Sequence, residues 1–290
     1  MRRIFKIICL SMLLFSFNSA KAQTNDPVIF LNHLYFVLDS ITYAHIFESP
    51  SLQQIADTSE KSVTTTNDTW HGKYFTGRNS YFEIFPPNGF SGATEGSIGL
   101  GFMTFKPGDL NKLEINWKKT SKDSLIKDTS TVVKDGKKIL WYYSLLLYPP
   151  DSLQQIYAWI MENTPEILKA TGFTDEEIKN PISWQDFYEK KSKIKFTKEF
   201  NSITSVTIIT NKNEFKYLKK SFLDFGLTEK SNTFSNDYIS ITCNITDITA
   251  SRLKTVEISL SNAVKEENIV VSKMLSIQLK GKKAVLTFVY

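Results

Sequence analysis

The sequence predicts an α+β fold in which a strand, a helix and several further strands recur along the chain. Short apolar, β-branched and aromatic runs lie between breaks rich in Asn, Asp, Gly and Pro, which is typical of strands. Other segments repeat apolar residues at helical spacing. The same order of elements recurs about three times, starting near Val28, Ser97 and Ile203, which indicates βαβββ modules.

Residues 1–22 are typical of an export signal. Met1–Lys6 is basic, and the apolar stretch Ile7–Phe17 is shorter than the roughly 20 residues that a membrane-spanning helix needs. Ala20-Lys21-Ala22 fits a cleavage site before Gln23. We therefore expect a bacterial protein that is exported to the periplasm or the extracellular space and keeps no stable membrane anchor after cleavage. An uncleaved anchor is the alternative.

The net charge of the mature chain gives no sign of a nucleic-acid partner. The formal net charge of the whole chain is +5, and removal of the four basic residues of the signal leaves +1. Cys243 is the single cysteine outside the signal, so no intrachain disulfide can form. Its alternating surroundings favour a buried position in a strand, with a reactive thiol as the alternative.

The first unit of the repeat lies between residues 28 and 85. Val28–Leu38 is an apolar and aromatic strand, and Asp39 or Ser40 can cap a helix that extends to about Ala56. Three further strands are predicted at Ser62–Thr66, Trp70–Phe75 and Asn79–Phe85. These elements form one βαβββ module.

A second, looser unit follows the first. Ser97–Phe105 alternates small and large residues, as expected for a strand packed closely against another backbone. A helix is predicted from Pro107 to Trp117, and Ile139–Tyr148 reads as a buried strand that ends at two prolines. Residues 23–150 are therefore expected to form one domain of two βαβββ-type modules.

The rest of the chain predicts a helical connector and a third module. Apolar residues recur at helical spacing near the start of residues 151–200, at Leu153, Ile156, Tyr157, Ile160 and Met161. Thr174 and Glu177 form the pattern of a capping box, which begins another helix. Residues 201–290 then predict a strand, a helix and four strands, a C-terminal βαβββ-like module that completes the first sheet or forms a second cleft.

The order of these elements resembles the vicinal oxygen chelate superfamily, which includes glyoxalase I, bleomycin-resistance proteins and extradiol dioxygenases. Many first strands of that superfamily begin with His and end with Val-x-Asp, and His33–Asp39 is similar. Tyr81–Phe85 is similar to the Glu-bearing strand that closes a glyoxalase module, and Asn213–Leu227 resembles the module helix and its following turn. The resemblance implies βαβββ modules that form curved mixed sheets around a cleft, in an exported glyoxalase-like branch.

The resemblance also implies a divalent-metal site, of which half is present. His33 and Glu83 match the ligands of a first module. The second module should add a His near Ser97 and a Glu within Leu145–Tyr148, and neither residue type occurs there. A catalytic zinc ion normally has three protein ligands, and His71 is the best candidate for the third. No cofactor is therefore expected, with a divalent metal as the alternative.

Glu83 is also a candidate for metal-independent chemistry. It shares a strand face with Tyr81 and Phe85, and apolar surroundings raise the pKa of a carboxyl group that lacks a partner. Such a Glu could act as a general base, with Arg78 or His33 as its partner. The alternatives are a structural Arg–Glu pair for Glu83 and a hydrogen-bonded core position for His33.

The residues expected to line the cleft and bind a ligand are Trp70, Tyr74, Arg78, Tyr81, Ser97 and Tyr148. The aromatic members on neighbouring strands could hold a ring or an acyl chain, and an ordinary aromatic core is the alternative. The first functional hypothesis is therefore an exported protein that binds a small aromatic or amphipathic molecule. The second is a metal-dependent lyase, isomerase or dioxygenase-like enzyme that uses His33 and Glu83.

Overall fold

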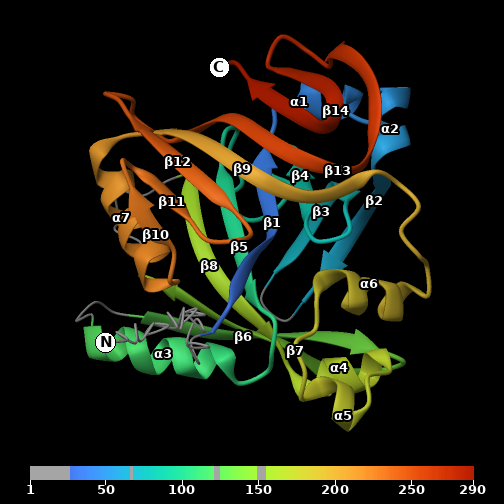
Figure 1. The fold of residues 1–290 in the computed structure, drawn as a ribbon, viewed down its shortest axis with the longest axis vertical. Helices are drawn as coiled ribbons and strands as arrows, with labels where there is room; N and C mark the ends of the chain where they lie inside the picture. Colours follow the sequence, from blue (N-terminus) through green and yellow to red (C-terminus); the bar gives the residue numbers. More distant parts are fainter. Residues whose placement is uncertain (1–26, 66–67, 121–124, 149–154) are drawn as a thin grey trace, which may run out of the picture.

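The computed structural model describes residues 27–65, 68–120, 125–148 and 155–290. The predicted export signal at residues 1–22 lies outside these ranges. None of the helices in the described part of the chain is long and apolar enough to span a bilayer. Within the described ranges, the framework consists of one sheet of eight strands and one of six (Figure 1).

The first βαβββ module forms one half of the large sheet. Its elements are β1 (Ile29–Val37), α1 (Ser40–His45), α2 (Pro50–Ile55), β2 (Asp57–Thr64), β3 (Thr69–Thr76) and β4 (Tyr81–Phe85). β4 lies parallel to β1, and β3 and β2 continue the sheet as antiparallel strands. Asp39 begins α1 because its side chain accepts hydrogen bonds from the backbone N–H groups of Ile41 and Thr42.

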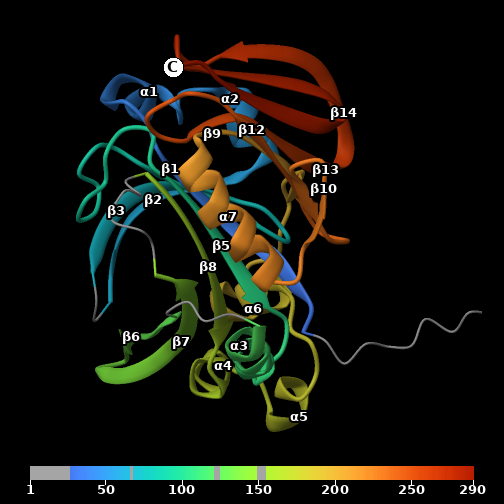
Figure 2. The same cartoon turned by 90° about the vertical axis from the view of Figure 1, so that its left-hand side faces the viewer.

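The second module repeats this pairing. Its elements are β5 (Ile98–Thr104), α3 (Asp109–Thr120), β6 (Leu125–Lys134), β7 (Lys137–Leu147) and β8 (Ile156–Asn163). β8 lies parallel to β5, and β7 and β6 follow as antiparallel strands. Antiparallel pairing of β1 with β5 joins the two modules. Figure 2 shows β2–β3 and β6–β7 extending toward the same side, so the sheet is curled and has a concave face.

Strand β8 corrects the prediction of a helix through Ile156–Met161, which was wrong. Ile156, Ala158 and Ile160 are fully buried on one face of the strand, and large side chains occupy the other face. Apolar and aromatic residues thus occupy both faces of this strand, so their spacing resembles that of a helix. The predicted strand at Ile139–Tyr148 corresponds to β7, which is therefore the third strand of its module and not the last.

Three helices connect the two sheets, namely α4 (Pro165–Thr171), α5 (Asp175–Ile178) and α6 (Trp184–Ser192). The predicted capping box of Thr174 and Glu177 is present at the start of α5. The small sheet contains a third βαβββ module with β9 (Phe200–Thr210), α7 (Lys212–Asp224), β10 (Thr228–Lys230), β11 (Thr233–Ser235) and β12 (Ser240–Ile245). The hairpin of β13 (Arg252–Val270) and β14 (Leu275–Phe288) extends this sheet beside β9.

The small sheet and α7 cover the convex face of the large sheet. Phe82 of β4 stacks on Phe200 of β9 with 5.4 Å between ring centroids. Phe102 of β5 contacts Phe225 at the end of α7, with 5.3 Å between centroids. The concave face stays free of the small sheet and is available for a site. The predicted fold class, α+β with βαβββ modules in curled mixed sheets, is confirmed.

Candidate functional site

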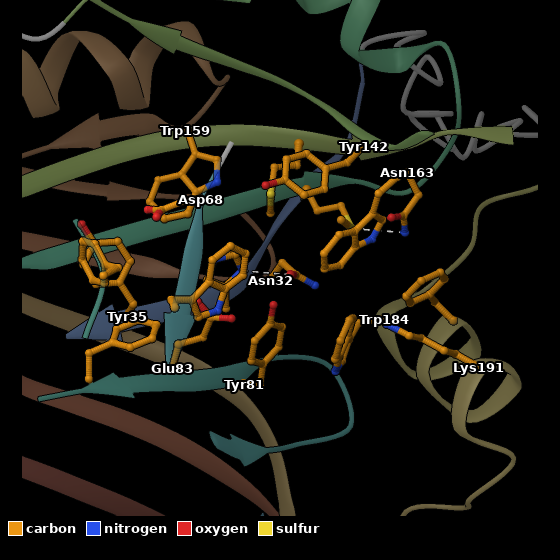
Figure 3. Close-up of a pocket in the computed structure, with 18 residues that line it drawn as sticks. Asn32, Tyr35, Asp68, Tyr81, Glu83, Tyr142, Trp159, Asn163, Trp184 and Lys191 are labelled. Carbon is orange, nitrogen blue, oxygen red and sulfur yellow. Dashed lines mark hydrogen bonds between the residues drawn. The ribbon is translucent and has the colours of Figure 1, made fainter. Parts of the chain in front are cut away.

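The concave face of the large sheet encloses a cavity of about 240 Å³. Strands of both modules and helix α6 line it, and aromatic side chains form most of its wall (Figure 3). The polar side chains in this wall belong to Asn32, His33, Asp68, Glu83, Asn163 and Lys191, beside the hydroxyl groups of the tyrosines.

One row of paired residues crosses the sheet from Tyr81 of β4 to Trp159 of β8. His33 of β1 lies between Tyr81 and Gly101 of β5, and Gly101 is paired with Trp159. A β-carbon at Gly101 would come within 2.4 Å of the imidazole. The His33 ring therefore lies over β5, with its centroid 4.9 Å from that of Tyr81 and 5.3 Å from that of Trp159.

The adjacent row contains Glu83 of β4, Tyr35 of β1 and Gly99 of β5. A β-carbon at Gly99 would come within 1.9 Å of the Tyr35 ring, so that ring also lies over β5 and reaches Trp159 at 5.8 Å between centroids. The close packing predicted for this small-residue strand is present, but its partners are two rings and not another backbone. The two glycines form a flat floor under the cavity.

A β-bulge directs Asn32 into the cavity beside His33. The register of β1 with β5 shifts between Leu31 and His33, so Asn32 is the extra residue. Its side-chain oxygen accepts a hydrogen bond of 3.0 Å from Nδ1 of His33, which leaves Nε2 as an acceptor. Nδ2 of Asn32 and Oδ1 of Asn163 are buried and have no hydrogen-bond partner within the described residues. A bound molecule with suitable polar groups would satisfy both amides.

Burial controls the charges in the cavity. It lowers the pKa of His33 to about 3, so the imidazole is neutral at neutral pH. It raises the pKa of Glu83 to about 7, and the positive charge of Lys61 opposes part of that rise. Within the described ranges, neither a hydrogen bond nor an ion pair joins the Glu83 carboxylate to another residue. An acid with a pKa near 7 can accept and release a proton under neutral conditions.

Helix α6 closes one end of the cavity. Trp184 stacks on Tyr81 with 4.6 Å between centroids, and its Nε1 donates a hydrogen bond of 3.2 Å to the backbone oxygen of Gly77. Lys191 lies two turns further along the helix, and its Nζ is 5.2 Å from the ring centroid of Trp141. The Lys191 side chain is exposed overall, but the rings shield its Nζ from water and lower the pKa of Lys191 to about 8.

A family model matches residues 31–288, a range that contains both sheets and the cavity. Its description is a family of unknown function, DUF5829. The chain belongs to the DUF5829 family. No curated protein matches it.

Two solved structures are similar to this DUF5829 member. The crystal structure of a hypothetical protein from Staphylococcus aureus has 13% sequence identity and a TM-score of 0.50, covering 84% of this chain and 96% of that one. The 2,2',3-trihydroxybiphenyl 1,2-dioxygenase of dibenzofuran-degrading Sphingomonas wittichii strain RW1 has 9% identity and a TM-score of 0.35, covering 74% of this chain and 68% of that one. The first likeness supports the fold alone.

Four of the residues predicted for the site of this DUF5829 protein lie together. His33, Trp70, Tyr81 and Glu83 all line the cavity. Tyr74 is paired with Glu83 on the same face of the sheet but does not line the cavity, and its hydroxyl accepts a hydrogen bond of 2.8 Å from Nε1 of Trp70. Tyr74 therefore holds a lining residue in place.

Two predicted polar residues lie away from the cavity. His71 faces the opposite side of β3 from Trp70, and its Nε2 lies 3.1 Å from Oε1 of Glu60. Arg78 donates a hydrogen bond of 3.0 Å from Nε to Ser261 of β13, so it binds the small sheet. His71 is therefore not placed to act as a third metal ligand, and Arg78 is not placed to pair with Glu83.

The remaining two predicted residues also lie outside the cavity. Ser97 is buried, and its hydroxyl is 3.0 Å from that of Thr94. Tyr148 is exposed just beyond the end of β7. Both residues were predicted to face the cleft as parts of the second module. The last strand of that module was predicted at Ile139–Tyr148, but it is β8, the next strand along the chain.

Sequence reasoning missed the lining residues of β8 and α6. Trp159, Met161 and Asn163 alternate along β8 toward the cavity, but their segment was interpreted as a helix. Lys191 belongs to a lysine-rich run and is exposed, so nothing in the sequence distinguishes it from the neighbouring solvated lysines. Tyr35 could have been found, because it lies two residues after His33 on a strand that was predicted.

The residues that face the cavity do not fit the metal site implied by the resemblance. His33 and Glu83 are present, but the second module offers Gly99, Gly101 and Trp159 at the facing positions. Nowhere in the described residues do three His, Cys, Asp or Glu side chains come together. A catalytic zinc ion normally has three protein ligands. The cavity therefore offers the chemistry of its own side chains.

Replacement of Glu83 by Gln is expected to stabilise the protein, and the gain should grow with pH. The pKa of Glu83 is 4.5 in its ordinary state and about 7 in the folded state, so the folded state prefers the protonated acid. In the unsubstituted protein, the contribution of this proton to the free energy of unfolding falls as the pH rises from 4.5 to 7. Above pH 7 the contribution no longer changes. The gain of Glu83→Gln should reach on the order of 3 kcal/mol. Urea unfolding of both proteins across this range measures it.

The effect of His33 runs the other way but does not disturb the comparison. Its pKa falls from 6.5 to about 3 on folding, so it makes stability rise with pH between those values in both proteins. The difference between the two proteins therefore isolates Glu83. A difference that stays constant with pH would contradict the burial described for the carboxylate.

Proposed function

We propose that the protein is exported and that it binds a small aromatic or amphipathic molecule in the cavity of its glyoxalase-like fold. The observation that carries the proposal is an unbroken series of ring contacts along the wall. The rings follow one another in the order Phe90, Tyr35, Trp159, His33, Tyr81 and Trp184. Such a surface suits a flat or apolar ligand, because rings attract one another in offset and edge-to-face contacts.

Two features favour a bound molecule over an ordinary aromatic core. The rings surround about 240 Å³ of space, whereas a core packs its side chains against each other without such gaps. Asn32 and Asn163 add amide groups with unpartnered atoms to an otherwise apolar wall. An apolar wall with a few convergent polar groups is the usual composition of a ligand pocket.

A second candidate is an enzyme that uses Glu83 as a general base. It is supported by the pKa of Glu83, which lies near 7 and therefore near the value that suits proton transfer at neutral pH. The metal-dependent lyase, isomerase or dioxygenase-like alternative has two ligands in the cavity, His33 and Glu83. It would require a further ligand from a source other than the described residues.

Thermal unfolding with and without a small aromatic probe tests the binding proposal. We expect 2-phenylethanol to raise the Tm of the purified protein, because a ligand that binds the folded state stabilises it by about 2.7 kcal/mol at 100 times its Kd. Trp159→Ala should abolish the shift, since it removes a ring that contacts both His33 and Tyr35. Tyr148→Ala is the matched control, because Tyr148 is aromatic but lies outside the cavity.

Metal analysis separates the binding protein from the metalloenzyme. The binding proposal predicts a Tm shift that EDTA does not change. Stoichiometric zinc, iron, manganese or nickel that disappears in Glu83→Ala would overturn it and support the metal-dependent enzyme. A probe shift that survives in Trp159→Ala would place the ligand elsewhere.

A further inference from the structure

We propose that the molecule bound in this cavity is a zwitterion with an aromatic ring, whose amine is held at Glu83 and whose carboxylate is held at Lys191. An aromatic amino acid is the simplest compound of this class. The inference rests on the proposed function, because it names the chemical class of the same ligand. Glu83 and Lys191 both line the cavity and lie apart in it, with Tyr81 and Trp184 between them (Figure 3).

The Glu83 end has the composition of a site for an organic ammonium group. Tyr35 lies opposite Glu83 on β1, and Tyr81 and Phe85 flank it two residues away on the same face of β4. Ring faces attract a cation that approaches within about 6 Å of their centroids. The Glu83 carboxylate has neither a hydrogen bond nor an ion pair with another described residue, so an ammonium group would supply the missing partner.

Among the described residues, no neighbouring group on the surrounding strands pairs with Glu83 in place of that ammonium group. Lys61 of β2 carries the positive charge that reaches Glu83, but its Nζ lies 4.3 Å above the ring centroid of Tyr74 and forms no ion pair with the carboxylate. His33 is neutral. Burial raises the pKa of the phenols that face Glu83, so they are also neutral at pH 7; they belong to Tyr35, Tyr74, Tyr81 and Tyr142.

The Lys191 end presents two hydrogen-bond donors, Nζ of Lys191 and Nδ2 of Asn163, beside the unpartnered acceptor Oδ1 of Asn163. Nζ of Lys191 lies 5.2 Å from the ring centroid of Trp141 and 5.6 Å from that of Phe187, and no carboxylate of the described residues pairs with it. Nδ2 of Asn163 has the sulfur of Met103 at 3.9 Å as its acceptor, which is a weak one. A ligand carboxylate would accept hydrogen bonds from both donors.

The two ends therefore differ in sign, and the aromatic wall lies between them. A purely cationic ligand would leave Lys191 paired with solvent alone, because its side chain is exposed, and a purely anionic one would leave Glu83 unpaired. A ring that carries both groups satisfies each end and stacks on the wall. The residues that distinguish the ligand class are thus Glu83 and Lys191, whereas the rings set its shape.

Isothermal titration calorimetry with four phenyl compounds tests this inference. Phenylalanine carries both charges, phenylethylamine the amine, 3-phenylpropionate the carboxylate, and 2-phenylethanol neither. Phenylalanine should bind tightest. Glu83→Gln should weaken phenylethylamine and phenylalanine about tenfold and leave 3-phenylpropionate unchanged or tighter. Lys191→Gln should weaken the two carboxylates roughly threefold to tenfold.

Two further variants sharpen the comparison. Lys190→Gln is the matched control for Lys191→Gln, because Lys190 pairs with Glu177 outside the cavity and should leave all four affinities unchanged. Lys61→Gln should strengthen phenylethylamine, because it removes the positive charge that acts on Glu83. This opposite sign cannot arise from general loss of folding.

The outcomes that overturn the inference differ from those that overturn the proposed function. If 2-phenylethanol binds as tightly as phenylalanine and Glu83→Gln changes neither affinity, the cavity binds aromatic rings regardless of the charge of the ligand. The zwitterion proposal then fails and the binding function stands. Tightest binding of 3-phenylpropionate would also overturn the zwitterion proposal, in favour of an anionic ligand. If none of the four ring compounds binds, both proposals fail.

Discussion

Replacing Gly99 by Ala is expected to destabilise the protein by about 1–3 kcal/mol and to abolish ligand binding in the cavity. The new β-carbon would lie 1.9 Å from Cε1 of Tyr35, and all three of its nearest atoms belong to that ring. β5 has strands on both sides, β1 and β8, so the backbone has little room to yield and the ring must move into the cavity. Urea unfolding measures the loss of stability, and calorimetry with phenylalanine or 2-phenylethanol measures the loss of binding.

A double variant identifies the cause of this effect. In a Tyr35→Ala background the ring is absent, so Gly99→Ala should cost less than about 0.5 kcal/mol if the clash with Tyr35 is its whole origin. The coupling free energy between positions 35 and 99 would then equal most of the destabilisation caused by Gly99→Ala alone. An equal cost in both backgrounds would show that the glycine is required for the backbone of β5 and not for the ring above it.

Replacing Phe102 by Ala is expected to cost about 3–5 kcal/mol of unfolding free energy. Phe102 is fully buried on the convex face of β5, between the rings of Phe222 and Phe225 at centroid distances of 6.1 and 5.3 Å. Its removal would leave a void under α7 that the surrounding side chains fill incompletely. Urea unfolding of the two proteins measures the difference.

The position of Phe102 makes a second result expected. Its neighbour Gly101 faces the cavity, whereas Phe102 faces α7, so Phe102→Ala should retain ligand affinity under conditions in which the variant is folded. Phe102→Leu is the control and should lose less stability, because it keeps more of the buried volume. A cost below about 1 kcal/mol would contradict the packing of α7 on this strand.

The first module could be predicted from the sequence because its strands are short and well separated. Breaks rich in Asn, Asp and Pro bound the strands of this module, and Asp39 marks the start of its helix. β8 could not be predicted in the same way. One face of β8 is buried in the core and the other carries Tyr157, Trp159 and Met161 on the cavity side, so apolar and aromatic residues occupy both faces and the polar alternation by which a strand is recognised is missing.

The candidate site was predictable only where it depends on alternation within one strand. Glu83 and Tyr81 share a face of β4 for that reason, and both line the cavity. The residues that surround Glu83 and Tyr81 are determined by the register between neighbouring strands, which for example pairs Glu83 with Tyr35. Register depends on the whole sheet, and the approach of Lys191 depends on how α6 lies across it. No spacing in the sequence encodes either.

The hydrogen bond from Trp184 to the backbone oxygen of Gly77 links helix α6, which closes the cavity, to the interface between the two sheets. The residues that follow Gly77 are bonded to β9, since the N–H groups of Arg78 and Asn79 donate to the backbone oxygens of Phe200 and Asn201. One short turn therefore holds α6 on one side and the small sheet on the other. Outward movement of α6 would strain the turn that is also bonded to the small sheet. A ligand that holds Trp184 in place should therefore also slow the separation of the two sheets.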